Sequence, residues 1–151
     1  MVSKKDIEII AHLRRDGRKK ITDIAKDTGI PVTTIYDRVR SHKKRFVKKH
    51  TALLDFEMLG LLSKAHLAIK ADRDSRLELQ MFMQDTPNVN SLYRVNLGYD
   101  YIAETVFRNM AELHNFAEQL ERDFKCRVEV FNVVEELKRE DFLTEPGHLD
   151  M

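Results

Sequence analysis

The stretch Ile21 to Lys44, which reads ITDIAKDTGIPVTTIYDRVRSHKK, predicts two short helices joined by a tight turn. Thr22 is expected to cap the first helix, because its hydroxyl can accept a free backbone N–H. Gly29 stands where a left-handed residue often ends a helix. Pro31 fits the first turn of the next helix, where its missing N–H is no loss. The stretch therefore has the pattern of a helix-turn-helix motif.

The second helix of this motif is expected to have one buried face and one polar face. Ile35 and Val39 lie one turn apart and should point inward. The opposite face and its flanks carry Thr33, Thr34, Tyr36, Asp37, Arg38, Arg40, Ser41 and Lys44. Such a face is typical of a helix that enters the major groove of DNA. An ordinary helical hairpin with a solvated charged face would show the same pattern, so the motif by itself leaves both interpretations open.

Charge separates the two ends of the chain. Residues 1–50 contain 15 Lys and Arg against 6 Asp and Glu, a net charge of +9. Residues 51–151 contain 11 Lys and Arg against 19 Asp and Glu, a net charge of −8. A basic module on an acidic body favours binding of a polyanion by the first part of the chain.

Composition limits the other classes of function. The single cysteine, Cys126, allows no intramolecular disulfide, and we expect a reducing cytoplasmic setting. No apolar run is long enough to cross a membrane. The sequence has no phosphate-binding or dinucleotide-binding fingerprint and no pair of histidines at metal-ligand spacing. We therefore predict a protein that is not an enzyme and that needs no cofactor or metal.

The first fifty residues predict a three-helix head. Ser3 and Asp6 have the spacing of a capping box at the start of a first helix. The helix-turn-helix stretch supplies the other two helices. The connection between the two parts is expected around residues 46–62 and includes TALLD at 51–55; Phe46, Val47, Leu53 and Leu54 are expected to form a short linking strand there.

Residues 63–136 read strand, helix, strand, strand, helix, strand. Alternating apolar residues predict strands at 63–71, 89–95, 99–107 and 126–134. One helix is expected to start at a further capping box, Ser75 with Glu78. Asn109 is expected to cap the next helix, with Glu112 three residues on. Leu97 and Gly98 are expected to form the turn between the middle strands.

This order predicts an α+β chain whose second part has the ferredoxin-like βαββαβ fold. Both helices would lie on one face of the sheet and leave the other face bare. A second copy of the sheet is the simplest cover, which predicts a homodimer that presents two heads to two DNA half-sites. The predicted domains are 1–50, a helix-turn-helix DNA-binding domain; 51–62, a linker strand; 63–136, a ferredoxin-like dimerisation and effector domain; and 137–151, a C-terminal tail.

The chain resembles the Lrp/AsnC family of leucine-responsive, or feast/famine, transcription regulators. The resemblance rests on the helix-turn-helix, on TALLD at 51–55, and on YRV at 93–95 and YDY at 99–101 within the βαββαβ pattern. It covers about residues 3–134. It implies a cytoplasmic regulator that dimerises through its C-terminal sheet, often assembles into octamers, and often senses an amino acid.

The resemblance also implies where an effector would bind. By position, Gly98, Tyr99, Asp100 and Tyr101 would lie at or beside an amino-acid pocket between neighbouring dimers. Many members of the family have Gly-Asp just before the Tyr-Asp-Tyr, whereas this chain has Leu97-Gly98. Because Gly98 supplies no carboxylate, this departure either removes amino-acid sensing or changes the amino acid that binds. Asp100 could bind an ammonium group, or it could be a turn residue whose side chain hydrogen-bonds its own backbone.

DNA contacts are predicted in two groups. Thr33, Thr34, Tyr36 and Asp37 are expected near base edges, and Arg38 and Arg40 near bases or phosphates. The remaining cations are expected to bind phosphates, which position a protein without reading sequence; they are Lys43, Lys44, Arg45, Lys48 and Lys49.

The predicted function is a sequence-specific regulator that binds double-stranded DNA as a homodimer or as a higher oligomer such as an octamer, with a small amino acid as the candidate effector. An alternative is an architectural DNA-binding protein without an effector, which the excess basic charge and the Leu97-Gly98 departure favour. The acidic tail at 137–151 either packs on a dimer partner through Leu137, Phe142 and Leu143 or is mobile.

Overall fold

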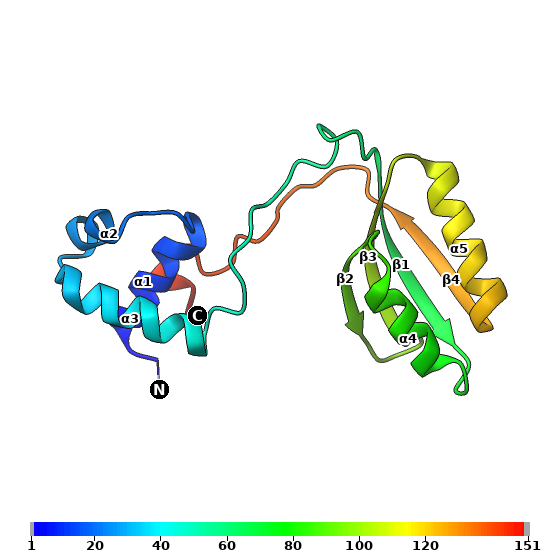
Figure 1. The fold of residues 1–151 in the computed structure, drawn as a ribbon, viewed down its shortest axis with the longest axis horizontal. Helices are drawn as coiled ribbons and strands as arrows, with labels where there is room; N and C mark the ends of the chain where they lie inside the picture. Colours follow the sequence, from blue (N-terminus) through cyan, green and yellow to red (C-terminus); the bar gives the residue numbers. More distant parts are fainter. Residues whose placement is uncertain (1, 150–151) are drawn as a thin grey trace. The chain divides into compact units, whose positions relative to one another are not determined.

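A computed structural model describes residues 2–149, except for the side chains of Lys43 and Leu149. The chain forms two compact units. The helical unit contains the residues up to Leu53 together with those from Leu137 onward, and the sheet unit spans Leu54–Glu136. The C-terminal tail therefore folds with the N-terminal helices rather than with the sheet that directly precedes it (Figure 1).

Three helices form the helical unit: α1 (Lys4–Arg15), α2 (Ile21–Thr28) and α3 (Val32–Arg45). Each contributes a fully buried isoleucine to one small core, namely Ile9, Ile24 and Ile35, which Ile30 completes from the α2–α3 turn. At the start of α1, the Ser3 side chain accepts from the Asp6 N–H while the Asp6 carboxylate accepts from the Ser3 N–H. The predicted capping box is thus confirmed.

The starts of α2 and α3 differ from the predicted positions. Thr22 does not cap α2, because the helix begins at Ile21 with Lys20 in the cap position, which places Thr22 inside the first turn. The Lys20 carbonyl accepts from the N–H groups of Asp23 and Ile24. Pro31 occupies the cap position of α3 rather than its first turn, and its carbonyl accepts from the Ile35 N–H at 3.0 Å.

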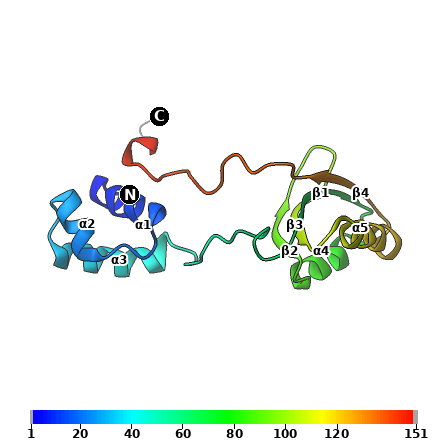
Figure 2. The ribbon, with the colours of Figure 1, turned by 90° about the horizontal axis from the view of Figure 1, so that it is seen from above.

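The tail packs against α1. Arg14 forms an ion pair with Glu140 and donates from Nε to the Phe142 carbonyl at 3.1 Å, and Arg15 donates to the Thr144 carbonyl at 2.9 Å. A short 3-10 helix, η1 (Pro146–Leu149), ends the described chain beside α1. Within this unit, α1 lies between the tail and α3, as Figure 2 shows. The sequence left two arrangements of the tail open, packing on a dimer partner or mobility. Packing against α1 of the same chain is a third arrangement.

The sheet unit consists of β1 (Ser63–Ala71), α4 (Arg76–Asp85), β2 (Val89–Arg94), β3 (Tyr101–Phe107), α5 (Met110–Phe124) and β4 (Cys126–Asn132). Its four strands are antiparallel, in the order β2-β3-β1-β4. Both helices cover the same face of the sheet (Figure 2). This is the ferredoxin-like arrangement that the sequence predicts.

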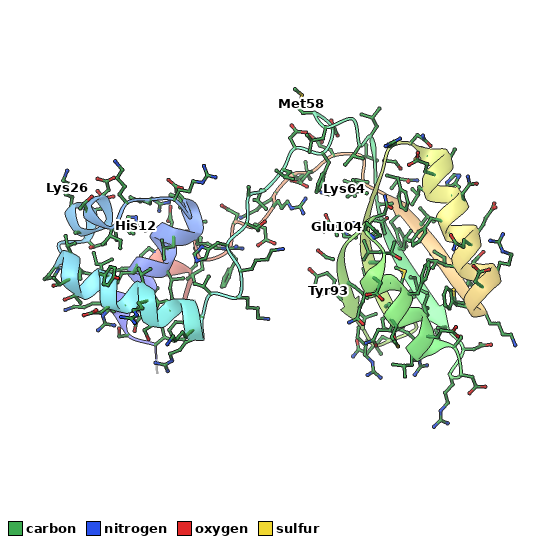
Figure 3. The ribbon with its side chains drawn as sticks, in the orientation of Figure 1. His12, Lys26, Met58, Lys64, Tyr93 and Glu104 are labelled. Atoms are coloured by element: carbon green, nitrogen blue, oxygen red, sulfur yellow. The ribbon has the colours of Figure 1, made fainter. Side chains whose placement is uncertain are left out.

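Alternation along the strands divides the sheet into two faces. Beneath α4 and α5 lie Ala65, Leu67, Ile69, Tyr101, Ala103 and Phe107, which are all buried. The face away from the helices is mixed, with Ala68, Ile102, Val106, Tyr93 and Phe131 beside Lys64, His66 and Glu104. Figure 3 marks Lys64, Tyr93 and Glu104 on this open face.

One of the two N-caps predicted for the sheet unit forms. Asn109 caps α5 by accepting from the Glu112 N–H at 2.9 Å. Ser75 does not cap α4, because its backbone is already helical, with φ −95° and ψ −6°, and its hydroxyl donates to the Asp72 carbonyl. An N-cap side chain reaches its target only from an extended backbone, so this prediction was wrong.

Strand boundaries also shift. The linker strand predicted from Phe46, Val47, Leu53 and Leu54 does not form in the described chain, where these residues are outside every helix and strand. A strand needs a neighbour to pair with its backbone, and the single chain offers none at this place. β3 begins at Tyr101 rather than at residue 99; the turn itself is formed by Leu97 and Gly98, and Tyr99 and Asp100 connect it to the strand.

Candidate nucleic-acid interface and effector region

Helix α3 presents one face to the core of the helical unit and the other to solvent. Ile35 and His42, two turns apart, are buried, and Val39 between them is half-buried. The opposite face carries Thr33, Tyr36, Asp37, Arg40 and Lys44, all exposed, with the half-buried Thr34 at its edge. An exposed helical face of hydroxyls, a carboxylate and cations has the groups that hydrogen-bond to base edges and phosphates.

The turn between α2 and α3 fixes where this face points. Gly29 ends α2 with φ +70°, and its N–H donates to the Ala25 carbonyl at 2.9 Å. The left-handed conformation costs glycine little, as the sequence predicts. Thr28 supports the turn, because its hydroxyl donates to the Ile24 carbonyl and accepts from the Ile30 N–H.

A basic segment continues from the end of α3. The side chains of Lys44, Arg45, Lys48 and Lys49 are exposed, and the prediction for Lys43 lies outside the described side chains. Arg45 lies over the Phe46 ring, 5.3 Å from its centroid. Arg40 and these four described cations form no ion pair with a described residue. Their charges are therefore available to an external polyanion.

Arg38 is held differently from the other predicted contacts. Its Nη1 donates to the Asp6 Oδ1 at 2.6 Å and to the Ser3 hydroxyl at 2.9 Å. The buried His42 ring meets the same carboxylate oxygen through Nε2 at 2.7 Å. Burial by itself raises the pKa of Asp6, but the hydrogen bonds from Ser3, His42 and Arg38 together hold it well below its usual range. Asp6 is therefore an anion at any physiological pH.

The β2–β3 turn holds the first two residues of the predicted effector region. Leu97 has φ +58° and is 93% exposed, and Gly98 has φ +100°. Tyr99 reaches from this turn to the open face of the sheet, where its hydroxyl donates to Glu129 at 2.7 Å. That hydrogen bond raises the pKa of Tyr99.

The other two residues of this region are bound within the sheet unit. The Asp100 carboxylate accepts from the Ala71 N–H at 2.9 Å and forms an ion pair with Arg76 at 2.9 Å. Tyr101 is buried, and its hydroxyl is 3.2 Å from both the Arg76 carbonyl and Gln80 Oε1. Asp100 thus ties the beginning of β3 to the end of β1 and to α4. The sequence marks the residue but not these partners, which come from distant segments.

The helical unit also contains a pocket. Glu8, His12, Arg15, Asp27 and Pro146 are among the residues that line it, from α1, the end of α2 and η1. None of the residues predicted to bind DNA or an effector lines this pocket. Its wall includes the tail, so the sequence alone gives no sign of it. His12 and Lys26 of this unit are marked in Figure 3.

The part of the chain that the structure describes contains neither a cluster of metal ligands nor a reactive thiol. Among residues 2–149, no group of His, Cys, Asp and Glu is arranged to hold a metal ion. Burial raises the pKa of the Cys126 thiol to about 11, so the thiol is protonated at neutral pH and unreactive. No described helix combines the length and the apolar character that a membrane span requires.

Comparison with known proteins identifies both units. Residues 3–41 match the AsnC-type helix-turn-helix domain, and residues 64–141 match the Lrp/AsnC ligand binding domain. The HTH-type transcriptional regulator FL11 of Pyrococcus horikoshii is 30% identical over 112 residues, which cover 74% of each chain.

Two solved structures share the fold. The LrpC protein of Bacillus subtilis superposes with a TM-score of 0.84 at 16% identity, over 91% of this chain and 98% of its own. A transcriptional regulator of Neisseria meningitidis, in complex with L-Met, superposes with a TM-score of 0.84 at 19% identity, over 92% of this chain and 94% of its own.

Proposed function

Because the chain belongs to the Lrp/AsnC family of transcription regulators, we propose that it binds specific double-stranded DNA sequences as a homodimer or a larger oligomer. The observation that carries this proposal is the solvent-facing side of α3. It combines hydroxyls, a carboxylate and a guanidinium with a basic segment whose described cations form no ion pair with a described residue.

In the proposed complex, α3 lies in the major groove. Thr33, Thr34 and Tyr36 would contact base edges, and Asp37 would accept from cytosine N4. Arg40 would reach a base or a phosphate. The phosphate contacts would come from the basic segment, namely Lys43, Lys44, Arg45, Lys48 and Lys49. Arg38 lies on the flank of this face, already bound to Asp6.

The open face of the sheet supports pairing of two copies. Tyr93 and Phe131 are 59% and 55% exposed there, beside Ile102. Two such faces packed together, about 10 Å apart, would remove this apolar surface from water. The linker at 51–55 would gain the strand partner that it lacks in the single chain. A two-fold dimer would then present two α3 helices, one to each half-site.

The second part of the proposal is an amino-acid effector. The Neisseria neighbour was solved with L-Met, which supports an amino acid as the class of ligand. Gly98, Tyr99, Asp100 and Tyr101 would lie at or beside its site. Titration calorimetry with the common amino acids, methionine included, tests this directly. Heat that saturates supports an effector, and no heat with any of them rejects it.

The alternative, an architectural DNA-binding protein without an effector, has one observation in its favour. Both oxygens of Asp100 are engaged by Ala71 and Arg76, so a ligand ammonium group would have to compete for that carboxylate. Footprinting on sequences selected from random duplexes separates the two functions. A regulator protects spaced, symmetric half-sites, whereas an architectural protein covers DNA evenly. A chain that binds no duplex at low salt would contradict both.

A further inference from the structure

We propose that Asp6 is a positioning residue that locks the recognition helix α3 in place, and that Arg38 serves this lock rather than contacting DNA. The inference rests on the proposed DNA-binding function and deepens it. It concerns four residues from two segments: Ser3 and Asp6 at the start of α1, and Arg38 and His42 on α3.

The geometry of the lock follows from helical spacing. Arg38 and His42 are four residues apart, so their side chains lie one above the other on α3. Both meet the same Asp6 oxygen, at 2.6 Å and 2.7 Å. One carboxylate that holds two successive turns of a helix restrains both its rotation about its axis and its sliding along it.

The other side of the carboxylate is fixed as well. Asp6 Oδ2 accepts from the Ser3 N–H at 2.9 Å and from the Ser3 hydroxyl at 2.6 Å. The same hydroxyl accepts from Arg38 Nη1 at 2.9 Å. The capping box of α1 and the clamp on α3 therefore share their atoms, and the carboxylate has little freedom to move.

Burial makes the lock sensitive to the loss of either partner. The side chains of His42, Asp6 and Arg38 are 2%, 14% and 33% exposed. Hydrogen bonds between charged groups in such sites depend strongly on geometry, and removal of one partner leaves the others with an uncompensated charge or polar group. His42 also contacts the Phe46 ring, with centroids 5.3 Å apart, which joins the lock to the end of α3.

Arg38 differs in this respect from Arg40, two residues along the same helix. Arg40 lies on the exposed face and forms no ion pair with a described residue. Arg38 lies on the flank, half-buried, with Nη1 already used. Arg40 is therefore the matched control: a cation on the same helix that should contact DNA directly.

The test compares full-length Asp6→Asn, Arg38→Gln, the double variant and Arg40→Gln. For each, the affinity is measured for a duplex selected by the wild-type protein and for a random duplex, across a range of salt concentrations. Partial unfolding would lower both affinities by the same factor and leave their ratio unchanged. The ratio of specific to random binding therefore reports the orientation of α3 rather than the amount of folded protein.

We expect Asp6→Asn and Arg38→Gln each to lower this ratio by roughly 10-fold, comparable to about one lost base contact. The double variant should lose no more than either single variant, because both changes open the same lock. The salt slope of both should equal that of the wild type. Arg40→Gln should reduce the slope by about 0.9 for each phosphate contact that is lost.

Any one of three results would overturn the inference. The first is a salt slope in Arg38→Gln that is reduced as in the Arg40 variant. The second is a double variant in which the two losses of specificity add, and the third is an unchanged ratio of specific to random binding in Asp6→Asn, Arg38→Gln and the double variant. Should Asp6→Asn fail to fold, Ser3→Ala takes its place, because it removes only the hydroxyl shared by Asp6 and Arg38. Ser3→Ala should lower the ratio in the same direction by a smaller factor and should not add to Arg38→Gln. If the wild-type protein binds no duplex, it is the proposed function that fails.

Discussion

Asp100 holds Arg76 in an ion pair of 2.9 Å at the edge of the sheet unit, and the same carboxylate accepts from the Ala71 N–H. The pair joins the start of β3 to the first turn of α4, and the backbone bond joins it to the end of β1. The residue that the family resemblance marks as a candidate effector contact thus also holds three elements together.

Asp100→Asn tests this structural role. The amide can still accept from the Ala71 N–H, but it loses the charge that pairs with Arg76. We expect the free energy of unfolding of the sheet unit to fall by about 1.5–3 kcal/mol, because a hydrogen bond to a charged group contributes that much to stability. Hydrogen exchange of the β1 and β3 amides in the full chain measures it. Lys70→Gln is the control, because Lys70 is more exposed and lies 3.7 Å from Asp100; equal protection in both variants would exclude the role.

Gly98→Ala tests the β2–β3 turn. At φ +100° a side chain is strained, although a Cβ there would meet no atom within 4 Å. The expected cost, about 1–2 kcal/mol in the sheet unit, therefore comes from the backbone and not from a clash. Gly147→Ala is the matched control, since its site is equally open and its φ is not in the left-handed region. If thermal unfolding of the two variants shifts alike, the turn does not require glycine.

Local patterns in the sequence predict the elements well. The alternation along 63–71 predicts β1 with the bounds that the structure shows, and Gly29 ends α2 as expected. Each of these signals depends on residues within one element or one turn. Ser75 shows the limit of such signals: its spacing to Glu78 fits a cap, but the preceding turn has already taken a helical backbone.

Long-range partners are beyond the reach of such patterns. Asp6 is recognisable as part of a capping box, but Arg38 and His42 lie 32 and 36 residues further on, and only the crossing of α1 and α3 brings them together. The same holds for the tail, whose Glu140 meets Arg14 across 126 residues. An acidic segment after the last strand indicates solvation, and nothing in its local sequence identifies α1 as its partner.

Removal of the tail should weaken α1. A chain that ends at Glu136 loses the Arg14–Glu140 ion pair and the hydrogen bonds from Arg14 and Arg15 to tail carbonyls. We expect the protection of α1 amides to fall by about 1–2 kcal/mol, mostly from the hydrogen bonds. Glu140→Gln alone should cost less than about 1 kcal/mol, because both partners are exposed.

The tail should have little direct effect on DNA binding, since α1 separates it from α3 within the helical unit (Figure 2). The truncated chain should therefore bind random duplexes as the intact chain does at temperatures where both are folded. If the α1 amides of the truncated chain kept the hydrogen-exchange protection of the intact chain, the tail would contribute nothing to the stability of the helical unit.

His12 should make the helical unit sensitive to mild acid. Burial, and then the nearby Lys19 ammonium, lower the pKa of His12 from its ordinary value of 6.5. Lys19 Nζ lies 2.9 Å from His12 Nδ1, so the neutral ring accepts the hydrogen bond that protonation would remove. The unfolded chain then binds a proton at a higher pH than the folded chain, and stability falls as the pH drops below about 6.5.

The measurement is the unfolding free energy of wild type and His12→Gln between pH 8 and pH 5. The difference in unfolding free energy between the two proteins should be constant above about pH 7.5. As the pH falls through 6.5, the wild type should lose stability relative to His12→Gln. The contribution of Asp6, whose pKa is lowered, would be lost only at far lower pH, below the ordinary carboxylate range. If the unfolding free energies of the two proteins changed in parallel between pH 8 and pH 5, His12 would not be the source of the sensitivity to acid.

Binding of the full-length protein to a selected duplex, followed by fluorescence anisotropy at increasing salt, tests the central claim most directly. If two basic heads neutralise about eight phosphates, the Kd should rise by roughly 10⁴-fold between about 50 and 200 mM salt. Arg40→Gln should flatten that dependence, and the protein–DNA stoichiometry should be at least two chains per site. A protein that remains monomeric and binds no duplex at low salt, or whose Kd does not change with salt, would contradict it.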